Sequence, residues 1–175
     1  MKKIIFVLIY LLVISCNQKQ DADFSLTGKT IGLEDGTMVY LDNADSQTID
    51  LIDSTEIRDN SFVFETKLPN SPLHVVIRTN DDSNFRFLWL EDSPMTFDAL
   101  QSNFENALVT GSTQENLAQP LRKELEKLSE EAQRKRELEF IEKHPNSIVS
   151  AEILSLYATS FDKTKTKKLF DKFSE

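Results

Sequence analysis

The residues best suited to acid–base or metal chemistry in this sequence are its two histidines, His74 and His144. A catalytic triad or a metal pair would require them to converge in space. His74 falls in a segment where apolar and polar residues alternate, and His144 stands beside a proline that ends a helical pattern. This spacing predicts separate structural roles, so we expect no catalytic residue set and no enzyme activity.

Carboxylates recur at every third position of one segment: Asp50, Asp53, Glu56 and Asp59. Because alternate residues of a strand point to opposite faces, this period scatters the acidic groups. Asp81-Asp82 and Glu91-Asp92 stand at expected strand ends, where neighbouring loops could gather calcium ligands. No EF-hand spacing occurs. We therefore expect solvated acidic loops, with no metal and no cofactor.

Phe85, Phe87 and Trp89 form an aromatic stripe with a period of two. Residues at this period share one face of a strand. The stripe predicts either a platform for a ligand or a row of core side chains. In a chain with 12 phenylalanines, we favour the core.

The elements that must position these residues divide the sequence into two regions. Residues 24–111 show short runs of alternating apolar residues, separated by turn-prone clusters rich in Asp, Asn, Gly and Pro. This pattern predicts a mainly β region, an antiparallel β-sandwich or small barrel of about seven or eight strands.

Residues 112–175 carry a helical period and form the expected short helical segment. Ser112-Thr113-Gln114-Glu115 has the form of a capping box, and we expect Pro120 to open the main helix. Ser147 and Asp162 are expected to cap later helices. One helix face carries a leucine stripe that would be an interaction face if the sheet leaves it uncovered: Leu117, Leu121, Leu125 and Leu128.

Charge also separates the two regions. The whole chain has a formal net charge of −9, yet residues 16–111 hold six basic and 17 acidic side chains, whereas residues 112–175 hold 12 of each. An acidic module repels phosphate backbones, so we expect no nucleic-acid partner.

The N-terminus has the pattern of an export signal. Met1-Lys2-Lys3 is followed by eleven apolar residues from Ile4 to Ile14, and polar residues follow Cys16 at once. A membrane-spanning helix needs about 20 apolar residues, so residues 1–15 are predicted to be a cleaved signal peptide.

Val13-Ile14-Ser15-Cys16 resembles the lipobox of bacterial lipoproteins. The resemblance implies cleavage between Ser15 and Cys16 and a lipid on Cys16, with residues 16–23 as a polar tether. Several acyl chains would hold a soluble domain at a membrane. We therefore expect a cell-envelope protein, lipid-anchored to the outer membrane and facing the periplasm or the surface. As Cys16 is the only cysteine, no intrachain disulfide can form.

A set of turn and core motifs resembles one family: Leu33-Glu34-Asp35-Gly36, Val39-Tyr40-Leu41, Asp53-Ser54, Phe62-x-Phe64, Trp89-Leu90-Glu91 and Val109-Thr110-Gly111-Ser112. They are similar to domain-of-unknown-function family 4369, an envelope β-domain usually found ahead of a thioredoxin-like domain. Phe140-Ile141 and Pro145-Asn146-Ser147 resemble the connector between those domains. At Asn60-Ser61 the family usually has a glycine, and we expect Asn60 to preserve the turn.

The resemblance implies a fold but no activity, because the family's redox cysteines belong to the thioredoxin-like part. We expect a non-catalytic scaffold or interaction module, stand-alone or truncated, that contacts another envelope protein. Two alternatives stay open: a module that binds glycan or peptide fragments, and the accessory half of a split thiol-disulfide oxidoreductase.

Overall fold

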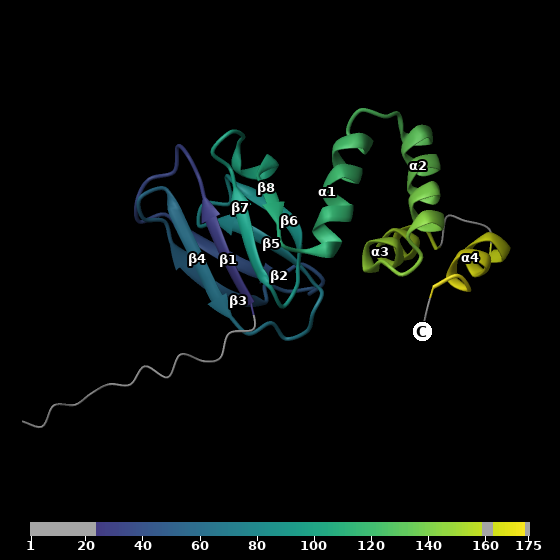
Figure 1. Cartoon of the computed structure of the whole chain (residues 1–175), viewed down its shortest axis with the longest axis horizontal. Helices are drawn as coiled ribbons and strands as arrows, with labels where there is room; N and C mark the ends of the chain where they lie inside the picture. The colour runs from purple at the N-terminus through teal and green to yellow at the C-terminus, as the bar shows by residue number, and fades with distance from the viewer. Residues whose placement is uncertain (1–23, 159–162, 174–175) are drawn as a thin grey trace, which may run out of the picture.

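The computed structural model describes residues 24–158 and 163–173, which form eight β-strands, one short 3₁₀ helix and four α-helices. The strands make two four-stranded sheets, and the helices gather at one side of them (Figure 1). The predicted β-rich fold followed by helices is confirmed. Its β region is an open sandwich and not a closed barrel.

The first sheet has the order β4-β1-β7-β8, made of β4 (Ser61–Thr66), β1 (Phe24–Lys29), β7 (Pro94–Asp98) and β8 (Leu108–Thr110). The second has the order β3-β2-β5-β6, made of β3 (Leu51–Glu56), β2 (Met38–Asn43), β5 (Leu73–Thr79) and β6 (Phe85–Leu90). Six strand pairs join these neighbours, and all are antiparallel except β1–β7, which is parallel. The predicted antiparallel sandwich is therefore confirmed, with β1–β7 as its one parallel pair among the described strands.

Alternating side chains build the core between the sheets. On β5, Leu73, Val75 and Ile77 are buried, while the residues between them point to the outer face. Inward residues of the other strands complete this cluster, among them Phe24, Leu26, Val39, Leu41, Phe62, Phe64, Leu88 and Phe97. Burying each such side chain stabilises the fold by about 1.5–3 kcal/mol.

The turn between β3 and β4 keeps its shape without glycine, as predicted. Asp59 and Asn60 have positive φ angles of 49° and 57°, and Arg58 and Ser61 pair across them. Asp and Asn accept the left-handed conformation better than most residues, because their short side chains bond locally.

A second apolar cluster lies outside the sandwich, among the helices. It contains buried residues of α1 (Thr113–Leu125), α2 (Glu130–Lys143), α3 (Ile148–Tyr157) and α4 (Lys163–Phe170), together with Trp89 of β6. Ser147 accepts a bond from the Val149 N–H at 3.2 Å and so begins α3 as predicted. Asp162 lies outside the described residues.

The expected role of Pro120 was wrong. α1 begins at Thr113 and Pro120 lies inside it. A proline has no N–H for the carbonyl four residues earlier, so α1 forgoes one backbone bond. Two side chains that precede the proline in α1, Glu115 and Gln119, fasten the helix to the edges of both sheets, as described below.

The leucine stripe does not follow one helix, because α1 ends at Leu125 and α2 begins at Glu130. The Gln133 amide donates to the carbonyls of Leu125 and Leu128 at 2.9 and 3.2 Å, which satisfies the turn between the helices. Leu121 is only 4% exposed, and Leu117 and Leu125 pack against the second cluster. The predicted leucine interaction face is therefore largely internal, and Leu128 lies in the turn.

None of the described helices is both long and apolar enough to cross a membrane.

Candidate binding site

The aromatic stripe of β6 faces away from the core, and the helices cover only its end. Phe85 and Phe87 remain 45% and 46% exposed, whereas Trp89 is 4% exposed within the helical cluster. The prediction that the stripe packs in the core was therefore wrong for the two phenylalanines. Because Phe85 and Phe87 are exposed beside a cavity, they form a candidate ligand platform.

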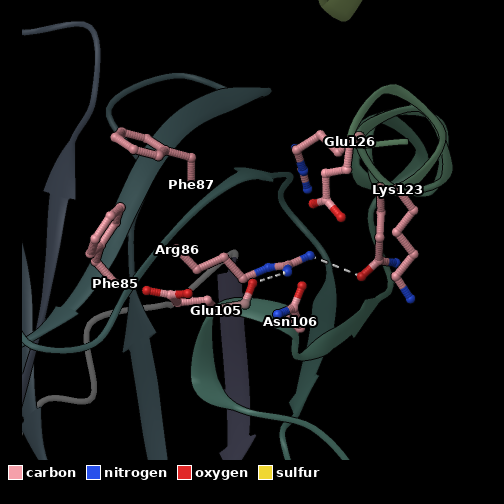
Figure 2. Close-up of a pocket in the computed structure, with 9 residues that line it drawn as sticks. Phe85, Arg86, Phe87, Glu105, Asn106, Lys123 and Glu126 are labelled. Carbon is pink, nitrogen blue, oxygen red and sulfur yellow. Dashed lines mark hydrogen bonds between the residues drawn. The ribbon is translucent and has the colours of Figure 1, made fainter. Parts of the chain in front are cut away.

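A cavity of about 240 Å³ opens beside this platform. Figure 2 shows Phe85 and Phe87 on one side of Arg86, with Lys123 and Glu126 on the helix side. The lining comes from β6, from the 3₁₀ helix η1 (Phe104–Asn106) and from α1 and its C-cap: Phe85, Arg86, Phe87, Glu105, Asn106, Gln119, Arg122, Lys123 and Glu126.

Arg86 forms the buried part of the cavity wall. Its guanidinium donates to the Glu105 carbonyl at 2.6 Å, to Gln119 Oε1 at 2.9 Å and to Glu115 Oε1 at 3.1 Å. Burial lowers the pKa of Arg86, and the carboxylate of Glu115 opposes that effect. Its Nε is buried without an acceptor in the described part of the chain. Arginine stays charged in proteins, so this wall carries a fixed cation.

Glu115 is the counter-ion of Arg86 and is fully buried. Ser112 Oγ accepts from the Glu115 N–H at 2.9 Å, as the capping box predicts. The Glu115 carboxylate, however, turns to the sheet: it accepts from the Trp89 N–H at 3.1 Å and from Arg86 and Arg122. Glu115 thus pairs with two guanidiniums and satisfies an edge N–H of β6.

Gln119 does the same for the edge of the other sheet. Its side-chain amide donates to the Val109 carbonyl at 3.2 Å and accepts from the Val109 N–H at 3.1 Å. One side chain therefore pairs with both backbone groups of an edge residue, as a neighbouring strand would. α1 closes the sandwich along β6 and β8 through these two residues (Figure 1).

His74 lies beside the platform on the outer face of β5, with its side chain mostly buried. Its ring stacks on Trp89 with centroids 4.8 Å apart and lies 5.8 Å from Phe87. Its Nδ1 is 3.4 Å from carboxylate oxygens of both Asp45 and Glu152, and burial raises the pKa of Glu152. His74 therefore links the aromatic row to α3. His144 instead ends α2 and packs on Phe140, so the two histidines contact different partners.

Four of the acidic residues singled out in the sequence already accept hydrogen bonds from, or form ion pairs with, groups of this chain. Asp50 accepts from Asn43 at 3.0 Å, and Glu56 pairs with Arg58 at 2.9 Å. Asp81 accepts from Thr79 and Ser83, and Glu91 accepts from the Gln114 N–H at 3.2 Å. Across residues 24–158 and 163–173, no group of three or more His, Cys, Asp or Glu is arranged to hold a metal ion.

Sequence reasoning missed the network of Arg86, Glu115 and Gln119. Its one signal was an arginine at an inward position of an alternating strand, because a buried cation requires a partner. Ser15 and Cys16, the predicted cleavage and lipid-attachment residues, lie outside the described residues.

The fold and cavity define a class: a β-sandwich module extended by helices, with an aromatic-flanked pocket where the two meet. The chain belongs to the family described as Domain of unknown function (DUF4369), whose model matches residues 24–117. Comparison with curated proteins and with solved structures gave no match. The family match includes Arg86 and Glu115 but ends before Gln119, Arg122, Lys123 and Glu126, which complete the pocket.

Proposed function

We propose that the protein is a non-catalytic lipoprotein of the cell envelope, held at a membrane by a lipid on Cys16, and that it acts by binding through the cavity beside Phe85 and Phe87. The observation that carries the binding role is the exposure of these two rings at 45% and 46% beside a hollow with polar walls. Pockets of this kind, with aromatic surface and a few convergent polar groups, are the usual places for ligands.

Binding fits the pocket better than chemistry does, because the buried charges are already paired. Glu115 accepts from three donors and Arg86 reaches three acceptors. A general base needs a free position toward its substrate. These groups instead set the shape and rigidity of the wall.

We therefore assign the interaction role to the aromatic platform and not to the leucine stripe. Leu121 is buried, so a partner cannot reach it without opening the helical cluster. Phe85 and Phe87 are accessible in the folded protein, and rigid aromatic side chains are common anchors of interfaces.

The binding role is tested by titrating the full-length lipoprotein with two probe panels, neutral oligosaccharides and hexapeptides. Trp89 is the only tryptophan and lies in the same ring row as Phe87, so its fluorescence reports occupancy. We expect saturable binding of a member of one panel that Phe87→Ala weakens by about tenfold or more. The matched control is Phe170→Ala, since Phe170 is 64% exposed on α4. A response to neither panel, or equal loss in both variants, would refute the role.

The anchor is tested separately, by feeding cells a palmitate analogue. Wild-type protein should carry the label and sediment with membranes, and Cys16→Ala should lose both properties, because the thiol is the predicted attachment point. Ser15→Ala, which keeps a small residue before the cysteine, should retain the label. Labelling of Cys16→Ala would contradict the proposal.

A further inference from the structure

We infer that the pocket beside Phe85 and Phe87 binds a neutral saccharide, an inference that rests on the proposed function. The charges that line the pocket favour a neutral ligand. The cationic groups of the lining are Arg86, Arg122 and Lys123, and the anionic ones are Glu105 and Glu126. Glu115 contacts both guanidiniums and adds a third anion, so the charges balance. A pocket with balanced charge gives a charged ligand no net attraction.

The pocket also supplies free hydrogen-bonding groups. In the described part of the chain, the side chains of Lys123, Glu126 and Glu105 form no hydrogen bond or ion pair, although all three line the cavity. An ammonium only donates and a carboxylate only accepts, so together they match a ligand group that does both. A hydroxyl is such a group. Figure 2 shows that Lys123 and Glu126 both extend from the helix, across Arg86 from the two rings.

The arrangement of the two phenyl rings disfavours a planar ligand. The centroids of Phe85 and Phe87 are 6.1 Å apart, and their planes meet at 81°. They offer no common flat surface, which disfavours a planar heterocycle stacked across both. A saccharide ring has C–H groups on its faces and hydroxyls around its rim. Its faces can pack on one phenyl ring while its rim meets the polar wall.

The main competing ligand is an extended peptide, which usually binds by adding a strand to a sheet edge. Part of the edges beside this pocket is already paired. Glu115 already accepts from the edge N–H of Trp89, and Gln119 pairs with both backbone groups of Val109. A peptide strand added along these edges would find those backbone groups already paired, whereas a saccharide needs no backbone pairing.

The test uses the full-length lipoprotein in a detergent without a sugar headgroup. The probes are cellohexaose, mannohexaose and maltohexaose, with hexagalacturonate as the acidic probe and a hexapeptide library as the peptide probe. We expect at least one neutral hexasaccharide to bind saturably, with a Kd that stays constant between about 50 mM and about 500 mM salt. Phe87→Ala should weaken binding by about tenfold or more, and Phe170→Ala should leave it unchanged.

A second variant separates pocket chemistry from folding. Glu126→Gln keeps the shape of the side chain but replaces one hydrogen-bond-accepting oxygen with an NH₂ group that only donates. It should therefore weaken saccharide binding without moving the urea midpoint. Preference for hexagalacturonate, or a Kd that rises with salt, would overturn the neutral ligand. Hexapeptide binding lost in Phe87→Ala would overturn the saccharide while sustaining a binding role. If none of the probes binds, both the saccharide ligand and the binding role are overturned.

Discussion

Removing the carboxylate of Glu115 tests the network that joins the sandwich to α1. In Glu115→Ala, the buried guanidinium of Arg86 loses its counter-ion and the Trp89 N–H loses its acceptor. Breaking a buried ion pair from one side costs about 3–5 kcal/mol, because an uncompensated charge stays behind. Folded domains are stable by only about 5–15 kcal/mol, so the loss is a large share of the total.

The measurement is urea unfolding, followed by Trp89 fluorescence and by far-ultraviolet circular dichroism. We expect Glu115→Ala to lower the free energy of unfolding by about 3–5 kcal/mol. The control is Glu124→Ala on the same helix. Glu124 pairs with Arg136 at 2.8 Å at the surface, and its removal should barely move the midpoint.

A double variant tests whether charge is the cause. Replacing Arg86 and Glu115 by methionine, singly and together, completes a double-mutant cycle. The double variant lacks the stranded cation, so it should be more stable than the sum of the two single losses predicts. A loss below about 1 kcal/mol in Glu115→Ala would refute the reasoning. Strict additivity in the cycle would also refute it, because independent sites do not share a buried charge.

Two further predictions concern backbone and pH. Gly111 and Gly32 both have positive φ, at +98° and +82°, but a Cβ at Gly111 would strike the Pro94 carbonyl while one at Gly32 meets nothing within 4 Å. Gly32→Ala should therefore cost about 1 kcal/mol and Gly111→Ala at least about 2 kcal/mol in urea unfolding, and equal costs would contradict the clash. Hydrogen bonds from Thr79 and Ser83 lower the pKa of Asp81 from 3.8 to about 2, so the stability it contributes is present above pH 3.8 and is lost as the pH falls through about 2. A carbon-13 NMR titration should place the Asp81 midpoint near 2, and a midpoint near 3.8 would show that these bonds are absent in solution.

The β region was predictable because burial follows local alternation. The alternating pattern of Leu73, Val75 and Ile77 predicts a strand with one buried face. The turn at Asp59-Asn60 follows from the left-handed conformation that Asp and Asn tolerate. Alternation does not say what covers the other face. Phe85, Phe87 and Trp89 look equivalent in sequence, yet only Trp89 meets the helices.

The binding site was less predictable because its contacts join distant residues. Arg86 and Glu115 are 29 positions apart, and Arg86 and Gln119 are 33 apart. The pattern Ser112-x-x-Glu115 predicted a helix start correctly, but the same pattern hid the main role of Glu115. Local rules assigned its carboxylate to the cap, whereas a buried arginine on β6 outweighs a solvated backbone N–H.

Closure of the sheet edges by α1 has a consequence for how the chain matures. Unpaired strand edges are templates for aggregation. A nascent chain must therefore carry β6 and β8 unprotected until Glu115 and Gln119 have emerged and α1 has formed. The smallest self-sufficient folding unit then extends past residue 117, where the family match ends, because Gln119 protects the β8 edge. A fragment that ends at residue 117 would keep every described strand but would leave the β8 edge unpaired and prone to aggregation.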